Sequence, residues 1–185
     1  MNKKILNLTR ASVMIALAVA LSFFKLFELG NGGSVTLGSM VPIILASFIL
    51  DFKFGFLTSF VYAILQMLLQ GVAAPPVESF SWYLLVIMLD YILAFTVLGL
   101  AGVITVKIKN KNLKVITGTV VVVGLRFLCH LLSGIIIWGV YAPEGQSIFV
   151  YSLLYNGSYM LGELIVTLAI MTLISNITYF KNMIK

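Results

Sequence analysis

Polar side chains stand inside otherwise apolar stretches of this sequence at Asp90, Arg126, His130, Asn156 and Glu163. An ionisable group surrounded by hydrocarbon is costly unless it pairs with another group or lines a polar cavity. Together these residues offer carboxylates, a guanidinium, an imidazole and an amide, which recognise small molecules through ion pairs and hydrogen bonds. We therefore expect them to form a binding site.

A stripe along one predicted helix collects Arg126, His130, Gly134 and Trp138, which are spaced by four residues and so share a helix face. We interpret the stripe as a pocket wall, in which Gly134 leaves space and the two rings stack on a planar ligand. The alternative is structural. In that case Arg126 pairs with Asp90, and Trp138 belongs to the aromatic belt at the membrane interface.

The ligand's chemistry is suggested by Asp90 and Asn156. Asp90 shares a predicted helix face with Tyr83, and a buried carboxylate beside an aromatic ring suits a cationic or amino-bearing ligand. A salt bridge to Arg126 is the alternative role of Asp90. Asn156 carries both a donor and acceptors, which match the edge of a heterocycle. Tyr151, in the same predicted helix, is a second candidate for ligand contact.

Three other polar residues lie within apolar segments. Glu163 is either a second pocket group or a contact between helices, and both interpretations stay open. Gln66 and Gln70 are predicted to donate hydrogen bonds between helices.

Catalytic, metal and cofactor chemistry has little support in the sequence. The single cysteine, Cys129, cannot form an internal disulfide, and one Cys with one His makes a poor metal site. No Gly-Lys-Ser, Gly-Lys-Thr or His-Glu-x-x-His motif occurs. Ser133 lies three residues from His130, but no third group is evident to orient that pair. We expect no catalytic residue, no metal and no cofactor.

The elements that position these residues are predicted to be transmembrane helices. The chain has 185 residues, of which 61% are hydrophobic and 10% charged, and a mean hydropathy of +1.12. This composition is typical of a membrane protein, and the length allows about six spanning helices. We predict an all-α integral membrane protein with one domain over 1–185 and helices at about 9–28, 38–51, 54–71, 79–106, 115–140 and 147–180.

Charged residues predict the orientation of these helices. With both termini cytoplasmic, the inner side holds Lys3, Lys4, Arg10, Lys53, Lys107, Lys109, Lys111, Lys114, Lys181 and Lys185. The outer side holds Lys25 with the acidic Glu28, Glu78 and Glu144. This asymmetry follows the positive-inside rule and explains the net charge of +6 without a nucleic-acid partner. It also places the polar cluster in the outer half of the membrane.

Two further segments are candidates for moving or docking parts. The glycine-rich loop at 30–34 is predicted to be a flexible lid. Ala16 and Ala20 form a small-xxx-small pair in the first helix, which permits close approach of another helix and predicts a protein-docking face.

Several strings together resemble the thiamine-binding S-components of energy-coupling-factor transporters, and the resemblance runs from the first helix to the last. The strings are Gly33-Ser34-Val35, Leu89-Asp90-Tyr91 through Ala94-Phe95, Arg126 to His130 with Ser133-Gly134, and Tyr141-Ala142-Pro143-Glu144-Gly145 followed by Tyr151-Ser152-Leu153 and Tyr155-Asn156. Where family members carry Glu and Lys, this chain has Asp90 and Arg126. No aromatic residue occurs in 29–39, where some members have one.

The resemblance implies a six-helix S-component bundle in the bacterial cell membrane that captures thiamine from outside. It implies docking through the helix that carries Ala16 and Ala20 onto a membrane scaffold subunit, which two cytoplasmic ATPases drive. The ligand-binding residues that we predict are Asp90, Tyr91, Arg126, His130, Gly134, Trp138, Tyr151 and Asn156. Thiamine fits them, because it joins an aminopyrimidine to a cationic thiazolium.

The sequence also leaves three alternative functions. The main alternative is a self-sufficient secondary transporter of a small planar cationic metabolite, which would need an ion-coupling site and usually has internal repeats. An intramembrane enzyme and a structural scaffold without a ligand are the remaining alternatives. We favour a non-enzymatic substrate-binding subunit of an ATP-driven importer.

Overall fold

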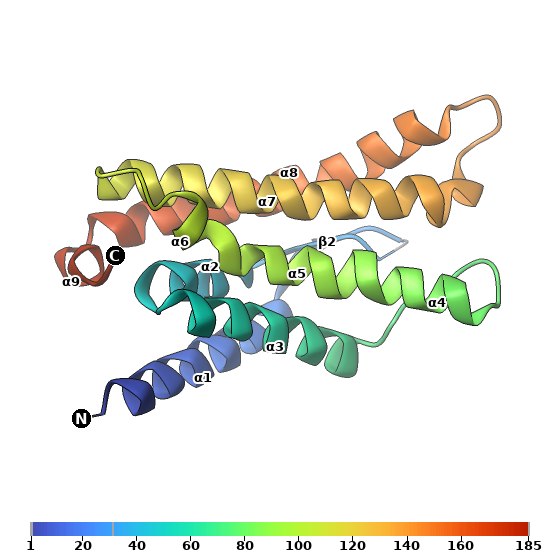
Figure 1. The fold of residues 1–185 in the computed structure, drawn as a ribbon. Helices are drawn as coiled ribbons and strands as arrows, with labels where there is room; N and C mark the ends of the chain where they lie inside the picture. Colours follow the sequence, from blue (N-terminus) through green and yellow to red (C-terminus); the bar gives the residue numbers. More distant parts are fainter. Residues whose placement is uncertain (1, 31, 185) are drawn as a thin grey trace.

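The computed structural model describes residues 2–30 and 32–184. It is a bundle of helices with one small two-stranded sheet, and both ends of the chain lie at the same end of the bundle (Figure 1). The described part contains five stretches long and apolar enough to cross a membrane, namely Lys3–Ser22, Phe52–Gln70, Phe80–Ile104, Lys111–Ile136 and Ile148–Asn176. These stretches confirm the predicted helical membrane protein, although the second predicted helix, 38–51, is a shorter apolar helix, Met40–Ile49.

The first helix ends earlier along the chain than predicted. Helix α1 (Lys3–Ser22) stops well before residue 28, and strand β1 (Lys25–Glu28) pairs antiparallel with β2 (Ser34–Thr36). Because Leu26 and Phe27 are apolar, the prediction from hydropathy extended the helix through them. The turn between the strands contains Gly32, whose φ of 97° is a conformation that glycine adopts without strain. Of the predicted lid at 30–34, Ser34 belongs to β2 and residue 31 lies outside the described residues.

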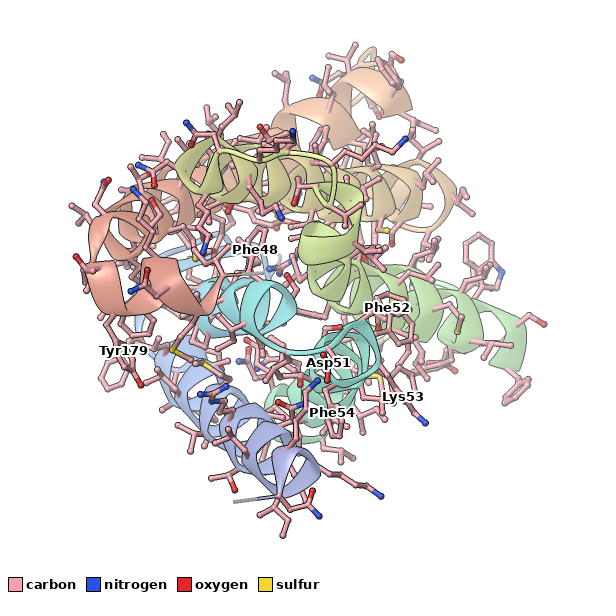
Figure 2. All side chains as sticks on the ribbon, turned by 60° about the vertical axis from the view of Figure 1, so that its left-hand side comes forward. Phe48, Asp51, Phe52, Lys53, Phe54 and Tyr179 are labelled. Carbon is pink, nitrogen blue, oxygen red and sulfur yellow. The ribbon has the colours of Figure 1, made fainter. Side chains whose placement is uncertain are left out.

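Helix α2 (Met40–Ile49) lies inside the bundle, and every one of its residues is buried. A helix that is apolar on all sides needs such a place, because it has no polar face to turn outward. The turn from α2 to α3 (Phe52–Gln70) lies at the end of the bundle that carries the termini (Figure 2). There Asp51 accepts a hydrogen bond from Asn7 at 3.0 Å and lies 3.4 Å from Lys3.

The stretch predicted as one helix over 79–106 is continuous but changes its winding. It consists of α4 (Phe80–Val86), a π-helix η1 (Ile87–Leu93), α5 (Ala94–Thr96), a 3-10 turn η2 (Val97–Leu100) and α6 (Ala101–Ile104). π-turns are rare and occur frequently at functional sites, and this one carries Asp90. Tyr83, which was predicted to share a helix face with Asp90, is not among the residues that line the cavity with it.

Two long helices form the remaining wall of the bundle and lie side by side (Figure 1). Helix α7 (Lys111–Ile136) begins earlier than the predicted residue 115, because Asn110 caps it by accepting a hydrogen bond from the Leu113 N–H at 3.1 Å. It ends before the 3-10 turn η3 (Trp138–Tyr141). Helix α8 (Ile148–Asn176) is separated from α9 (Thr178–Met183) by the extended residue Ile177, so the predicted helix 147–180 is interrupted there.

Candidate ligand-binding site

A cavity of about 530 Å³ lies between the hairpin, α3, η1, α7 and α8. Ligand sites for small molecules typically have volumes of roughly 300–1,000 Å³. The cavity occupies the part of the bundle away from the termini, because its lining comes from the last turns of α1 and α3 and the first turns of α8. All eight predicted ligand-binding residues line it: Asp90, Tyr91, Arg126, His130, Gly134, Trp138, Tyr151 and Asn156.

A hydrogen-bonded network centred on Asp90 organises one end of the cavity. Asp90 Oδ2 accepts hydrogen bonds from Ser133 Oγ at 2.7 Å and from Trp138 Nε1 at 3.0 Å. Asp90 Oδ1 lies 3.2 Å from His130 Nδ1. These three partners come from α7 and η3, so the carboxylate on η1 fixes the orientation of two rings on another element.

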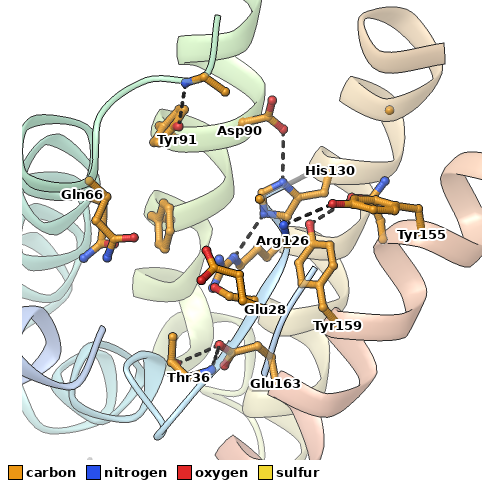
Figure 3. Close-up of a pocket in the computed structure, with 18 of the residues that line it drawn as sticks. Glu28, Thr36, Gln66, Asp90, Tyr91, Arg126, His130, Tyr155, Tyr159 and Glu163 are labelled. Carbon is orange, nitrogen blue, oxygen red and sulfur yellow. Dashed lines mark hydrogen bonds and ion pairs between the residues drawn. The ribbon is translucent and has the colours of Figure 1, made fainter. Parts of the chain in front are cut away.

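Arg126 continues this network toward the centre of the cavity (Figure 3). Its Nε donates to His130 Nε2 at 3.3 Å, which leaves His130 Nδ1 as the nitrogen that donates to Asp90. Its guanidinium carbon lies 4.2 Å from the centre of the Phe95 ring, a cation–π contact. Arg126 therefore reaches Asp90 through His130, rather than by the direct salt bridge considered as an alternative.

Gly134 permits the close approach of α7 and α8. A Cβ atom built there would overlap Ser152 Oγ and lie 2.8 Å from Asn156 Nδ2. Ser152 Oγ in turn donates to the Leu131 carbonyl at 2.9 Å. The space that the sequence suggested for a ligand is therefore largely filled by side chains of α8, although Gly134 also lines the cavity.

Tyrosines and an amide form the α8 wall. The rings of Tyr151 and Tyr155 stack with their centres 5.9 Å apart, and Tyr155 meets Tyr159 edge-on at 6.1 Å. Tyr159 donates its hydroxyl to Asn156 Oδ1 at 2.9 Å, and Asn156 Nδ2 donates to the Ser152 carbonyl at 3.0 Å. The Asn156 amide is thus already oriented by its neighbours, a preorganised group that a ligand edge can approach.

The hairpin closes another side of the cavity and is tied to α8. The Gly33 N–H donates to the Tyr155 hydroxyl at 3.2 Å. Glu163 Oε1 accepts from the Thr36 N–H at 2.7 Å and from Thr36 Oγ1 at 2.8 Å. Figure 3 places Thr36 and Glu163 at the end of the pocket away from Asp90 and Tyr91, and we call this end the floor. Glu163 therefore lines the pocket and joins α8 to strand β2, so the contact is not with another helix, as one of the two interpretations expected.

Uncharged polar groups supply the wall opposite α8. Gln66 and Gln70 of α3 donate to Ser22 Oγ of α1 at 3.1 and 3.0 Å, as expected for contacts between helices. All three side chains also line the cavity. Tyr91 accepts a hydrogen bond from the Ala73 N–H at 3.2 Å, which ties η1 to the segment after α3. This wall offers hydroxyl and amide groups for a neutral part of a ligand.

Sequence reasoning missed several lining residues, among them Lys25, Glu28, Thr36, Phe95, Tyr141 and Tyr159. Lys25 and Glu28 pair at 2.6 Å on the hairpin, which was not predicted as a hairpin. Tyr159 follows Tyr155 and Tyr151 at four-residue spacing, so the helical repeat of tyrosines was a signal that could have found it. No comparable sequence pattern indicated Thr36, because its hydrogen-bond partner, Glu163, lies far away in sequence.

The predicted docking residues lie outside the cavity. Ala16 and Ala20 are exposed on α1, whereas Ala11 and Ala18 are buried toward the bundle. No group of three or more His, Cys, Asp or Glu side chains suited to a metal ion occurs among the residues that the structure describes.

Comparisons with known proteins agree on one family. The model of a family described as "Thiamine transporter protein" matches residues 8–182. The thiamine transporter ThiT of Bacillus subtilis is 29% identical, with 94% of this chain and 92% of that protein covered. ThiT of Lacticaseibacillus paracasei is 24% identical, with 91% of this chain and 86% of that protein covered. A solved structure of ThiT from Listeria monocytogenes has a TM-score of 0.77 at 23% identity, and covers 96% of this chain and 97% of that one.

Proposed function

The chain belongs to the thiamine transporter protein family, and from this premise we propose that it binds thiamine in the cavity for uptake into the cell. The observation that carries the proposal is the arrangement of the Asp90 network. A carboxylate, two ring systems and a guanidinium from three elements converge on one preformed cavity. Such a site suits a planar ligand that carries positive charge.

Each part of thiamine has a matching part of the wall. The aromatic rings of Trp138 and the α8 tyrosines offer faces for stacking on the thiazolium and the pyrimidine. Asn156 Oδ1 accepts one hydrogen bond from Tyr159 and keeps a second lone pair, which suits a donor at the edge of a heterocycle. The hydroxyl and amide groups of Ser22, Gln66 and Gln70 suit a neutral alcohol, such as the hydroxyethyl group of thiamine.

We further propose that partners supply the energy for uptake. In this proposal the chain is the substrate-binding subunit, and an energy-coupling-factor module with a membrane scaffold and two cytoplasmic ATPases drives release inside. Exposed Ala16 and Ala20 on α1 support a docking role, because small residues let another helix approach closely. The protein itself is then a binding subunit, not an enzyme.

The orientation that fits this role places both termini in the cytoplasm. The structure brings the basic segments to one end of the bundle, since Lys111 Nζ donates to the Lys181 carbonyl at 2.8 Å and Lys3 lies beside the α2–α3 turn. Lys25 pairs with Glu28 at the other end. By the positive-inside rule, the basic end of the bundle faces the cytoplasm. The cavity, at the other end, then opens toward the exterior.

The test is a titration of the detergent-purified protein with thiamine, followed by tryptophan fluorescence. We expect saturable quenching by thiamine and none by a non-planar cation of the same charge. Absence of any thiamine response would reject the proposed substrate.

Reconstitution in liposomes separates the two transport mechanisms. Uptake that needs the ATPase module supports the proposal, whereas uptake by this chain alone, driven by an ion gradient, would indicate a secondary transporter.

A further inference from the structure

The His130 ring lies between a side chain that can only donate hydrogen bonds and a carboxylate that accepts them (Figure 3). The guanidinium of Arg126 has no acceptor atom, so its Nε, 3.3 Å from His130 Nε2, donates to a ring nitrogen that carries no proton. On the other side of the ring, Asp90 Oδ1 lies 3.2 Å from Nδ1 and accepts its proton in a hydrogen bond. In this arrangement the imidazole carries one proton and no charge.

Arg126 is fixed in the position from which it donates. Its guanidinium carbon lies 4.2 Å from the centre of the Phe95 ring. Phe95 in turn meets the ring of Tyr62 edge-on, with the ring centres 5.4 Å apart, and Tyr62 is fully buried. The packed interior of the bundle, rather than a ligand, therefore holds the N–H of Arg126 against His130.

His130 is one of the surfaces that a ligand in the cavity meets. The side chains of His130 and Asp90 keep 11% and 17% of their surface exposed, and both line the cavity. A protonated imidazole would add a second positive charge beside Arg126 and would repel a cationic ligand. A neutral imidazole leaves the negative charge of Asp90 available to attract that ligand.

The charges around the whole cavity favour a neutral His130 as well. The described lining holds two cationic side chains and three carboxylates, namely Lys25, Arg126, Glu28, Asp90 and Glu163. With His130 neutral, their formal charges leave one net negative charge, which complements a ligand with one positive charge. Protonation of His130 would cancel that net charge.

We propose that Arg126 is a positioning residue that keeps His130 neutral, with its proton on Nδ1, so that the Asp90 end of the cavity accepts a cation. Resting on the proposed function, this cation is thiamine, whose thiazolium carries a permanent positive charge. Arg126 then supports cation binding although it is itself a cation, because it acts on the ligand through the protonation of His130.

Other titratable groups near His130 leave this assignment unchanged. Tyr159 of α8 meets the His130 ring edge-on, with the ring centres 6.0 Å apart, and a tyrosine hydroxyl ordinarily keeps its proton at neutral pH. The remaining charged side chains of the lining bond elsewhere, Lys25 to Glu28 at 2.6 Å and Glu163 to the Thr36 N–H at 2.7 Å.

The first experiment is nitrogen NMR spectroscopy of the full chain in detergent, without ligand, at pH values on either side of the ordinary histidine pKa of about 6.5. His130 is the only histidine in the sequence, so isotope-labelled histidine reports on this ring alone. We expect the wild type to show one protonated ring nitrogen, Nδ1, at about pH 6 and at about pH 8. Protons on both nitrogens, or on Nε2 alone, would overturn the proposal.

Arg126→Met removes the donor and keeps a long side chain. We expect its His130 to carry protons on both ring nitrogens at about pH 6, because Nε2 no longer faces an N–H while Asp90 still favours the charged ring. Thiamine binding by this variant should weaken about tenfold from pH 8 to pH 6, whereas the wild-type affinity should change much less. Because both proteins bind the same ligand, the pH response of thiamine itself cancels in the comparison.

Arg126→Lys is the conservative variant, since an ammonium group is also a cation that only donates hydrogen bonds. We expect it to restore the singly protonated ring and the flat pH response. If Arg126→Met and the wild type respond to pH alike, Arg126 acts only through packing and the proposal is rejected. If Arg126→Met does not fold, doubly protonated His130 in the wild type or in Arg126→Lys still rejects it.

Failure of the proposed function is distinguishable from failure of this inference, because the spectra need no ligand. A singly protonated His130 in a wild type that does not bind thiamine would reject the proposed substrate and support the assignment of Arg126. Thiamine binding by a wild type with a doubly protonated His130 would reject the assignment and leave the substrate in place.

Discussion

Trp138 donates its indole N–H to Asp90 across 3.0 Å, from the 3-10 turn η3 to the π-helix η1. The ring lies beyond the end of α7, where helical packing alone would not fix it. Ser133 strengthens the arrangement, because its hydroxyl lies 3.1 Å from Trp138 Nε1 and donates to the same carboxylate oxygen. The aromatic face offered to a ligand is thus set by a carboxylate on another helix.

Asp90→Asn should weaken thiamine binding because it disrupts this arrangement. Oδ2 accepts two hydrogen bonds, and an amide placed with its NH₂ at that position would face two donors. Turning the amide over would instead set its NH₂ against His130 Nδ1. We expect a loss of about tenfold or more in affinity, measured by fluorescence titration.

Ser133→Ala is the control for this variant, because it removes one donor and keeps the bond from Trp138 to Asp90. We expect a smaller loss of affinity than for Asp90→Asn. Equal affinity of Asp90→Asn and the wild type would show that the carboxylate does not set the binding geometry.

Tryptophan fluorescence should report binding through one residue. The chain has two tryptophans, Trp82 and Trp138, and only Trp138 lines the cavity. We expect Trp82→Phe to retain the quenching by thiamine and Trp138→Phe to lose it. Isothermal titration calorimetry on both variants separates a lost signal from lost binding. Quenching that survives in Trp138→Phe and disappears in Trp82→Phe would place the ligand elsewhere.

Gly134→Ala should destabilise the contact between α7 and α8. The new methyl group would overlap Ser152 Oγ, which would have to release its bond to the Leu131 carbonyl. Overpacking of this kind costs about 1–3 kcal/mol. We expect a lower midpoint of thermal unfolding in detergent and weaker thiamine binding, because Asn156 lies at the same contact.

Gly124→Ala is the matched control on the same helix. A Cβ atom there meets nothing within 4 Å, so the substitution adds no clash. Its effect on stability should be neutral or favourable, since alanine is the better helix former by about 1 kcal/mol. Equal midpoints for the two alanine variants would contradict the proposed packing role of Gly134.

The cavity could be predicted largely from side chains that are unusual in apolar helices. Arg126, His130 and Asn156 stand out by residue type alone, and the four-residue spacing placed Arg126 and His130 on one face. Their burial at a common cavity follows from the cost of leaving them in hydrocarbon. The sequence did not predict the hydrogen-bond partners within the cavity. His130 bonds to both Arg126 and Asp90, and spacing along one helix does not indicate that His130 lies between them.

The hairpin and the floor of the cavity were beyond sequence reasoning. Leu26 and Phe27 have the hydropathy of a membrane helix, although both are exposed on β1. The bond between Thr36 and Glu163 joins residues 127 positions apart, and no local periodicity connects them. The π-helix was also hidden, because apolar residues on every side of 87–93 leave no period to read.

Docking through α1 should be separable from ligand binding. Ala16 and Ala20 are exposed and lie away from the cavity, so a large side chain there should leave the thiamine titration unchanged. We expect Ala16→Trp to reduce copurification with the scaffold and ATPase subunits and to reduce ATP-driven uptake in liposomes, because bulk prevents close helix approach. Val13→Trp, on an exposed but already bulky position of the same helix, is the control and should reduce both less. Full uptake by Ala16→Trp would indicate that docking uses another surface. A loss of thiamine binding would instead mean that the substitution disturbs the bundle.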